Sequence, residues 1–309
     1  MTRIAHGILL WCLLTGMHAV AQHKMPGEKE DARLRAILAP MLEQFRGEAG
    51  IYVHHLRTGK TVAINADTIF PTASMVKIPI LLGVFDKIAK GELAYKQELI
   101  YKDSLLYEGE DILGSFKSGE KITLDKVMML MLTMSDNTAS LWLQSLAGGG
   151  AVINQWLEQH GLKDTRVNSR TKGREGNRSI YGWGQTTPRE MAGLMARIYK
   201  GEMVNKAASE RMYRNLTRNH WDAEGLQQVP PDVRTASKNG CVDEARSEVI
   251  LVNAPHGDYV YCICTKNNVD QRWKRDNEAW VLMRAAGQAI WKHFEPKSKW
   301  SPDPAMGQF

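Results

Sequence analysis

Apolar residues follow clear periods near both ends of the chain. In residues 31–46 they recur three or four positions apart, and residues 276–294 show the same amphipathic helical period. Strand-forming runs at 50–56 and 61–64 flank a turn-forming segment at 57–60. The pattern predicts a helix and a β-hairpin at one end of the chain and a closing helix at the other.

Helical patterns dominate the middle of the chain. Thr72 is a suitable N-cap for a helix that begins at Ser74 and runs past Lys87. Further helical periods follow between about residues 80 and 225, at 124–134, 138–146, 151–160 and 188–199. Strand patterns return at 234–241, 248–253 and 259–265, with a tight turn at 255–258.

This order of elements predicts an α/β protein of the α+β type. The simplest assembly is one antiparallel sheet built from both chain ends and flanked by the terminal helices, with an all-helical lobe inserted. The α/β lobe would comprise residues 30–70 and 226–295, and the helical lobe residues 71–225. We expect a cleft where the two lobes meet.

The first 21 residues have the three parts of a secretory signal peptide. Arg3 supplies a positive start, residues 8–14 are apolar, and Ala19-Val20-Ala21 matches a cleavage site. The apolar run is too short to span a bilayer, and the alternative of a buried N-terminal helix is disfavoured by the polar residues that follow. We expect an exported protein, secreted or periplasmic, that starts near Gln22 and has no membrane span.

Composition is that of an ordinary globular protein, with 43% apolar and 24% charged residues over 309 positions. The formal net charge is +6, and loss of residues 1–21, which contain Arg3 and no acid, would leave +5. The one basic cluster indicates either a solvated loop or an electropositive rim for carboxylate-bearing substrates, and not a nucleic-acid partner. Its members are Arg166, Arg170, Lys172, Arg174 and Arg178.

Cysteine and histidine point to no metal, cofactor or disulfide framework. Cys12 would leave with the signal peptide. Three cysteines would remain, namely Cys241, Cys262 and Cys264, and an odd number leaves at least one thiol unpaired. Cys262 and Cys264 alternate onto one strand face, which favours buried thiols over a disulfide. None of the nine histidines stands in a zinc-binding motif. We expect a monomer that uses neither metal nor cofactor.

Three short motifs occur in order, Ser74-Met75-Val76-Lys77, Ser135-Asp136-Asn137 and Lys238-Asn239-Gly240. Each motif alone is a weak signal. Ser118…Lys121 and Ser169…Lys172 repeat the first spacing, and Lys117-Ser118-Gly119 resembles the third motif.

Local context separates the first motif from its copies. Ser74 and Lys77 stand one helical turn apart, so the amine can reach the hydroxyl. The preceding residues place Ser74 in the first turn of a helix, where the positive end of the dipole favours a developing oxyanion. The copies at Ser118 and Ser169 have loop-like surroundings. Separately, these residues have ordinary roles as caps or surface charges, so their joint order carries the hypothesis.

The ordered motifs resemble those of the class A β-lactamase-like serine hydrolases, in the β-lactamase and penicillin-binding protein superfamily. The likeness extends over about residues 30–295 and includes Thr186-Thr187-Pro188. It implies the serine β-lactamase-like fold, with one catalytic domain over residues 22–309. It also implies a hydrolase that is acylated by β-lactams or related amides and deacylated by water.

The resemblance assigns catalytic roles to three side chains. Ser74 would be the nucleophile, and Lys77 would be the base or proton relay that activates it. Ser135 would pass a proton toward the leaving nitrogen and would be tied to Lys238.

The resemblance also assigns substrate-binding roles. Asn137 would hold the side-chain amide of the substrate, and Lys238 would supply positive charge. The backbone N–H of Cys241, together with that of the nucleophile, would form the oxyanion hole. Asn239 replaces a Thr or Ser whose hydroxyl usually helps to bind the substrate carboxylate, although an amide can still donate a hydrogen bond.

A second departure from the family pattern concerns turnover. An ungapped comparison places Thr171 where such lactamases carry the glutamate that activates the deacylating water, and Glu175 stands four residues on. Glu175 could serve only if its loop folded back, and Lys77 is the alternative base. We therefore expect slow deacylation.

Three functions remain open from the sequence. The first is an exported β-lactamase-type hydrolase, and the second is a penicillin-binding or D,D-peptidase-like acyl enzyme that acts on cell-wall peptides. The third is a non-catalytic binding protein on the same scaffold. The intact Ser74, Lys77, Ser135 and Lys238 argue against the third function, and the absent glutamate argues against a fast version of the first.

Overall fold

The computed structural model describes residues 27–107 and 111–305, so the expected signal peptide at 1–21 lies outside the described residues. Both ends of the chain build the main sheet, in the strand order β1-β3-β2-β11-β10-β9. β1 runs parallel to β3, and the other neighbours are antiparallel. The strands are β1 (Lys29–Glu30), β2 (Glu48–His55), β3 (Lys60–Ile64), β9 (Thr235–Val242), β10 (Ala245–Val252) and β11 (Tyr259–Lys266).

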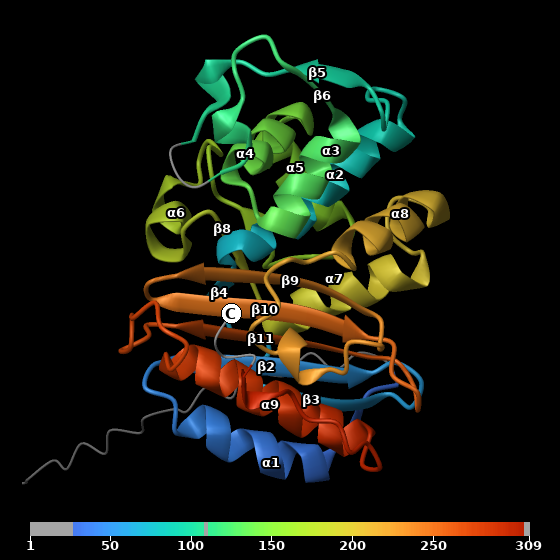
Figure 1. The fold of residues 1–309 in the computed structure, drawn as a ribbon, viewed down its shortest axis with the longest axis vertical. Helices are drawn as coiled ribbons and strands as arrows, with labels where there is room; N and C mark the ends of the chain where they lie inside the picture. Colours follow the sequence, from blue (N-terminus) through green and yellow to red (C-terminus); the bar gives the residue numbers. More distant parts are fainter. Residues whose placement is uncertain (1–26, 108–110, 306–309) are drawn as a thin grey trace, which may run out of the picture.

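Two helices, α1 (Ala32–Glu43) and α9 (Glu278–Phe294), cover one face of this sheet and contact each other there (Figure 1). Leu38 of α1 and Ile290 of α9 join Ile51 and Ile263 of the central strands in one apolar cluster. Because alternate residues of a strand point to opposite faces, only one face of each strand contributes to this cluster. The predicted sheet with its terminal helices is confirmed.

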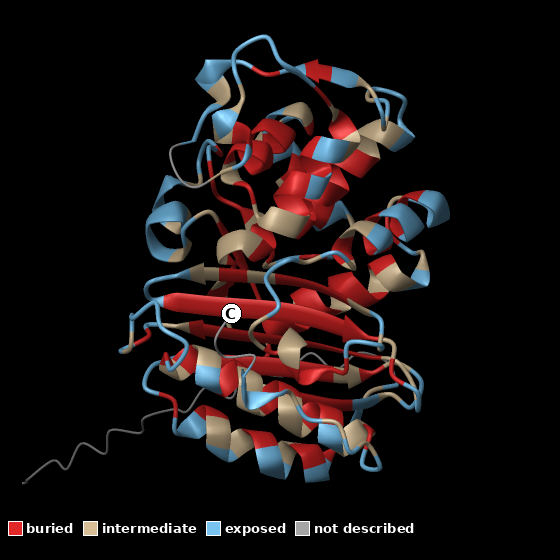
Figure 2. Ribbon diagram, viewed as in Figure 1, coloured by how far each residue is buried: buried red, intermediate tan, exposed pale blue. Residues whose placement is uncertain are grey.

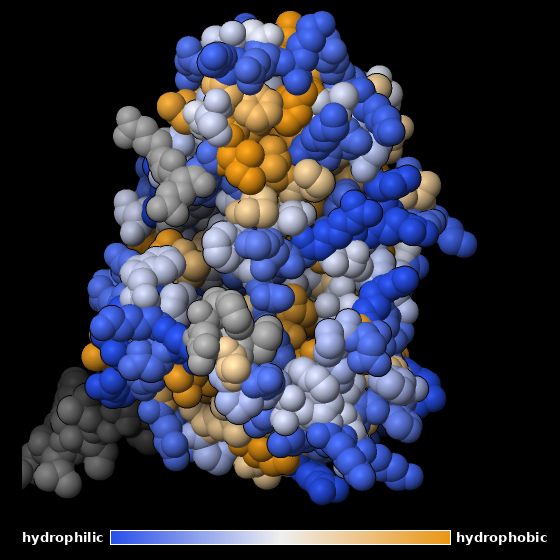
Figure 3. Space-filling model, in the orientation of Figure 1, coloured by the Kyte–Doolittle hydropathy of each residue, from blue (hydrophilic) through white to orange (hydrophobic). Residues whose placement is uncertain are grey.

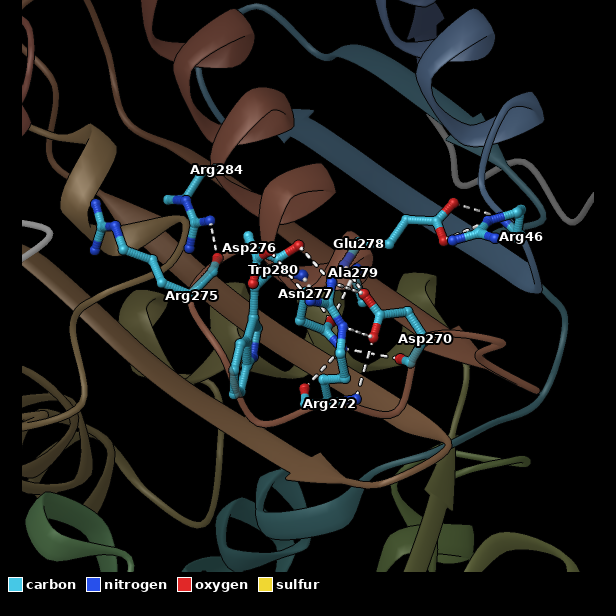
Figure 4. Close-up of polar contacts among 10 residues, drawn as sticks. All are labelled: Arg46, Asp270, Arg272, Arg275, Asp276, Asn277, Glu278, Ala279, Trp280 and Arg284. Atoms are coloured by element: carbon cyan, nitrogen blue, oxygen red, sulfur yellow. Dashed lines mark hydrogen bonds and ion pairs between the residues drawn. The ribbon is translucent and has the colours of Figure 1, made fainter.

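Polar contacts fix the segment that leads into α9 (Figure 4). The Asn277 side chain caps the helix by accepting from backbone N–H groups of the first turn. The Asp270 carboxylate accepts from the Arg272 side chain at 2.9 Å and from the Glu278 N–H at 3.1 Å. Glu278 also pairs with Arg46 at 3.0 Å, which ties the start of α9 to the loop after α1.

The opposite face of the sheet is covered by α7 (Pro188–Lys200), which packs against β2, β10 and β11. Thr187 caps α7, Pro188 occupies its first turn, and Gly201 ends it with a φ of 80°. The apolar cluster on this face continues into the inserted lobe, where one whole helical stretch, 77–85, is buried. Figure 2 shows the central strands of the sheet and much of the helical lobe next to it as buried.

The inserted lobe departs from the prediction of an all-helical unit. Residues 71–225 contain a two-stranded sheet, and they also supply β7 and β8 of a three-stranded sheet in the order β4-β8-β7. The strands are β5 (Glu98–Ile100), β6 (Lys121–Thr123), β4 (Phe70–Pro71), β7 (Arg166–Val167) and β8 (Gly184–Thr186). The remaining helices are α2 (Lys77–Ala89), α3 (Leu124–Met129), α4 (Asn137–Leu146), α5 (Gly149–Gln159), α6 (Glu175–Tyr181) and α8 (Lys206–Leu216).

Two helices next to the sequence motifs differ from their predicted forms. The helix expected from Ser74 is split, because a 3₁₀ turn, Ala73–Val76, precedes α2. The predicted cap at Thr72 is wrong, since its side chain makes no capping hydrogen bond. The helix expected over 124–134 is α3 followed by a π-helical turn, Leu130–Met134. Such irregular turns often mark functional sites.

The face of the molecule in Figure 3 is mostly hydrophilic over the sheet, whereas apolar side chains gather over the helical lobe at the top. Within the described ranges, no helix is both long enough and apolar enough to cross a membrane.

Candidate active site

Lys77, at the start of α2, lies at the centre of the candidate site. Its Nζ lies 3.1 Å from the Ser74 Oγ, 2.9 Å from the Ser135 Oγ and 2.8 Å from the Asn137 Oδ1. It also contacts the Ser135 carbonyl oxygen. Helical spacing alone places Ser74 next to Lys77, whereas tertiary folding places Ser135 and Asn137 there. The structure therefore joins the first two motifs through one amine.

Irregular backbone presents both serines. Ala73, immediately before the candidate nucleophile, has a φ of 42°, and Ser135 has a φ of 61°. Non-glycine residues seldom adopt such left-handed values unless their surroundings impose them. Asp136 supports the second turn, because its carboxylate accepts from the Ala139 N–H at 2.7 Å and from the Leu113 N–H at 2.9 Å. Asp136 is thus the N-cap of α4, as the sequence context allowed.

Strand β9 lies directly against the 3₁₀ turn that carries Ser74. A Cβ on Gly240 would lie 2.4 Å from the Thr72 carbonyl oxygen and 2.5 Å from the Ser74 backbone nitrogen, so only glycine fits there. The Ser247 hydroxyl donates to the same Thr72 carbonyl at 2.8 Å. This close approach brings Cys241, the next residue of β9, into the same cleft as Ser74.

The cleft has a volume of about 420 Å³ and is lined by segments of both lobes. Ser74, Asn137 and Cys241 line it, and Tyr107 and Trp183 form an aromatic wall with their rings edge to face at 5.1 Å. The other lining residues are Pro71, Ala73, Ile180, Tyr181, Gly182, Val242, Glu244, Ala245, Lys266 and Asn267.

Lys238 is fully buried on β9 beside the cleft. Its Nζ donates to the Asn239 carbonyl oxygen at 2.9 Å and to the Asn239 Oδ1 at 3.2 Å. Among the described residues it makes no hydrogen bond with Ser135, so the tie that the resemblance implies is absent from this arrangement. The Asn239 amide oxygen engages the lysine, and neither side chain lines the cleft.

Burial changes the protonation of these groups. Burial, reinforced by the charge of Lys238, holds the pKa of Lys77 well below its usual range. Burial also lowers the pKa of Lys238 to about 8. A neutral Lys77 amine can accept a proton from a hydroxyl, and a charged Lys238 can attract a carboxylate. Burial raises the pKa of the Cys241 thiol, which leaves its backbone N–H as the group it can offer to an oxyanion.

The segment expected to hold a deacylation base offers no carboxylate to the cleft. Thr171 is buried, and its Oγ1 donates to the Ser169 carbonyl at 2.9 Å. It packs against Gly150, where a Cβ would lie 1.8 Å from the Thr171 Oγ1. Glu175 is exposed at the start of α6 and accepts from the Gly173 N–H at 3.1 Å. Neither Thr171 nor Glu175 lines the cleft.

The competing copies of the first motif lie away from the cleft. Ser118 is exposed, and its Oγ accepts from the Asp103 N–H at 3.3 Å. Ser169 is buried, and its Oγ donates to the Gln144 Oε1 at 2.7 Å. The structure brings neither serine to a lysine amine within hydrogen-bond distance among the described residues.

The basic cluster at 166–178 forms no rim on the cleft, because none of its members lines it. Arg166 donates to two backbone carbonyls at 2.6 and 2.8 Å. Arg174 donates to the side-chain oxygens of Asn168 and Gln185 at 3.0 and 2.7 Å. Arg170, Lys172 and Arg178 are exposed. The structure favours the loop interpretation of this cluster.

The remaining cysteines are free thiols. Cys262 and Cys264 are fully buried on β11 with their sulfurs 3.7 Å apart, as the strand alternation predicted. Across residues 27–107 and 111–305, no group of three or more His, Cys, Asp or Glu side chains is arranged to hold a metal ion.

Sequence reasoning missed the walls of the cleft. Tyr107, Ile180 and Trp183 stand in segments without a recognisable motif, and no spacing marks them. Glu244, in the β9–β10 turn, was also missed. Its carboxylate accepts from the Gln271 side chain at 3.4 Å, and in the described part of the chain it has no hydrogen bond to the serines or lysines of the site.

The comparisons with known proteins agree with this geometry. The model of the β-lactamase enzyme family matches residues 32–294. The β-lactamase VEB-1 of Pseudomonas aeruginosa is 24% identical over 234 residues, which are 72% of this chain and 78% of that protein. A mutant of PBP-A, solved as an acyl-enzyme complex with penicillin G, is 24% identical with a TM-score of 0.78, covering 88% of this chain and 100% of that one. A class A β-lactamase from Mycobacterium abscessus is 21% identical with a TM-score of 0.74, covering 84% and 99%. Because the family model spans most of the chain and the fold agrees, this protein belongs to the β-lactamase enzyme family.

Proposed function

We propose that the protein is an exported, monomeric serine hydrolase of the class A β-lactamase type, acylated at Ser74 by β-lactams or related amides. The observation that carries the proposal is the 3.1 Å contact between the Lys77 Nζ and the Ser74 Oγ. The amine is buried and its pKa is depressed, so it is suited to accept the hydroxyl proton. The signal-like residues 1–21 support export.

Acylation follows from the contacts around Lys77. The Ser74 Oγ attacks the carbonyl carbon of the substrate while its proton passes to the Lys77 amine. The backbone N–H groups of Ser74 and Cys241 stabilise the oxyanion. The Ser135 Oγ, 2.9 Å from the same amine, passes a proton to the leaving nitrogen. The carbonyl carbon–nitrogen bond then breaks and leaves an ester on Ser74.

Deacylation is the slow step of this proposal. Hydrolysis of the ester needs a base beside the water, and Thr171 has no titratable group near neutral pH. Glu175 accepts from the Gly173 N–H and does not line the cleft. Lys77, as the neutral amine, remains as the base for a slow reaction.

A penicillin-binding or D,D-peptidase-like enzyme that acts on cell-wall peptides is the second candidate. It would form the same ester on Ser74 and release it differently. The lack of a carboxylate at Thr171 favours this candidate over a fast lactamase. The intact contacts among Ser74, Lys77 and Ser135 argue against a non-catalytic binding protein.

Incubation with a fluorescent penicillin tests the proposal by separating a slow acyl enzyme, a fast lactamase and a non-catalytic protein. A label that persists over many minutes supports the proposed slow acyl enzyme, and a label that appears and disappears within the first time points supports a fast lactamase. Absence of any label on the folded protein would contradict the proposal and leave the non-catalytic scaffold.

Replacing Lys238 by alanine is expected to slow acylation by carboxylate-bearing substrates more than acylation by neutral esters. Lys238 does not line the cleft, so the substrate loses the attraction of a nearby positive charge. For a charge about 10 Å away at an effective dielectric constant of about 20, this attraction is worth roughly 1.7 kcal/mol, which corresponds to about a tenfold loss. Acylation rates for a penicillin and for an uncharged ester measure the difference. An equal loss for both substrates would assign Lys238 to proton transfer alone.

A further inference from the structure

A segment between α8 and β9 caps the turn that carries Ser135. The His220 N–H donates to the Thr133 carbonyl at 3.1 Å, and the Trp221 indole N–H donates to the Met134 carbonyl at 3.0 Å. Both carbonyls belong to the end of the π-helical turn. The last carbonyls of a helix have no hydrogen-bond donors within the helix. Here a segment distant in the sequence supplies those donors.

The same segment is anchored to the strand of the third motif. The Asn219 Nδ2 donates to the Ser237 Oγ at 3.1 Å and to the Trp221 carbonyl at 3.1 Å. The Trp221 backbone N–H donates back to the Asn219 Oδ1 at 3.2 Å. Residues 219–221, which we name the 219–221 bridge, thus join the residue before Ser135 to the residue before Lys238.

The indole hydrogen bond acts on the torsion that matters most for Ser135. The Met134 carbonyl belongs to the peptide bond that enters Ser135, so its orientation is coupled to the φ of Ser135. That φ is 61°, a left-handed value that relaxes unless neighbouring contacts hold it. Trp221 is 49% exposed, so its contribution to the apolar core is small.

We propose that the 219–221 bridge positions the Ser135 hydroxyl for proton delivery to the leaving nitrogen, with Trp221 as its principal positioning residue. This inference rests on the proposed function, because it assigns a role within that acylation step. Trp221 touches neither the substrate cleft nor Lys77. It acts through the Met134 carbonyl and the backbone of Ser135.

The leaving group separates positioning from a merely structural role. An amide nitrogen leaves after it receives a proton, whereas a thiolate leaves without one. Displacement of the Ser135 hydroxyl should therefore slow acylation by a β-lactam and spare acylation by a thioester of similar acyl group. A general loss of structure would slow both reactions equally.

Trp221→Phe removes the indole N–H and keeps an aromatic ring. We expect acylation by benzylpenicillin to fall at least about tenfold, since small displacements of a catalytic group cost up to about 10²-fold, while thioester acylation is unchanged. Trp291→Phe is the matched control, because it removes an indole hydrogen bond to the Ser298 Oγ, at 3.2 Å, near the end of α9. The control should leave both rates unchanged. Equal slowing of both substrates by Trp221→Phe, or no slowing, would overturn the proposal.

Amide hydrogen exchange tests the bridge independently of activity. The backbone N–H groups of Ser135 and Asp136 donate to the Leu130 carbonyl, so they report on this turn. Their exchange should be faster in Trp221→Phe and unchanged in Trp291→Phe. If the wild-type protein is never acylated, the proposed function fails while this measurement still decides on the bridge. Unchanged exchange at both amides would overturn the bridge.

Discussion

Replacing Ser74 by alanine is expected to abolish covalent labelling by β-lactams while the protein stays folded. Two serine hydroxyls contact the Lys77 amine, and of these Ser74 lines the cleft whereas Ser135 does not. In the described part of the chain, the Ser74 hydroxyl makes no side-chain hydrogen bond except that with Lys77. Its removal should therefore cost at most about 1 kcal/mol of stability. Mass spectrometry of the intact protein after incubation with benzylpenicillin, together with thermal unfolding, measures both effects.

The competing serines provide the controls for this variant. Ser118→Ala should be labelled like the wild type, because Ser118 is exposed and makes only a weak loop contact. Ser169→Ala should also be labelled, although loss of the buried bond to Gln144 should lower its stability by about 1 kcal/mol. If Ser74→Ala keeps the label and one of the control variants loses it, the nucleophile is the serine replaced in that control and not Ser74.

Replacing Lys77 by methionine is expected to slow acylation by about 10²–10⁴-fold, the usual contribution of a general base. Methionine keeps an unbranched chain of similar length and removes the amine that contacts the Ser74 Oγ. Stopped-flow acylation of the variant and the wild type at one pH gives the ratio. A variant that is acylated at the wild-type rate would show that another group deprotonates Ser74.

Measuring the stability of the Lys77→Met variant distinguishes loss of the amine from misfolding as the cause of slow acylation. The folded-state pKa of Lys77 lies below its unfolded value, so the buried lysine destabilises the protein at low and neutral pH. That cost fades as the pH rises toward the unfolded pKa of about 10.4. The methionine variant should therefore stay folded at neutral pH, and its stability relative to the wild type should decline as the pH rises.

The same lysines predict the pH dependence of the wild type. Acylation should rise with pH as Lys77 loses its proton at a depressed pKa. For carboxylate-bearing substrates it should fall again above about pH 8, where Lys238 loses its charge. In Lys238→Ala the alkaline fall should disappear and the acidic rise should remain. An alkaline fall that persists in Lys238→Ala would assign it to a different group.

Long periodic segments of this fold could be predicted because one buried face sets their pattern. Helices α1 and α9 follow this rule, whereas strands β2 and β11 show as near-continuous apolar runs because the terminal helices cover one face and α7 covers the other. The two- and three-residue strands β4, β7 and β8 are too short for alternation to show. The 3₁₀ turn at Ala73–Val76 depends on the close approach of Gly240, a tertiary contact that local preference does not contain.

In the candidate site, too, local relations could be predicted from the sequence, whereas tertiary contacts could not. Ser74 and Lys77 meet because one helical turn separates them, which is a local relation. The arrival of Ser135 and Gly240 depends on the tertiary fold, and the sequence indicated it through the resemblance. The depressed pKa of Lys77 arises from burial that spacing cannot show. Trp221 stands in no motif, and its contact with Met134 crosses 87 positions of the chain.

Rapid mixing with a chromogenic cephalosporin tests the central claim most directly, namely that the ester on Ser74 forms faster than water removes it. The cleft lining includes neither Thr171 nor Glu175, and its one carboxylate, Glu244, makes no hydrogen bond to the serines or lysines of the site in the described part of the chain. Deacylation should therefore lack a positioned carboxylate base, which is normally worth about 10²–10⁴ in rate. We expect a burst of chromophore equal to the enzyme concentration, followed by a slow linear phase, with the acyl adduct visible by mass. Fast linear hydrolysis from the first turnover, without a burst or an accumulating adduct, would contradict this account.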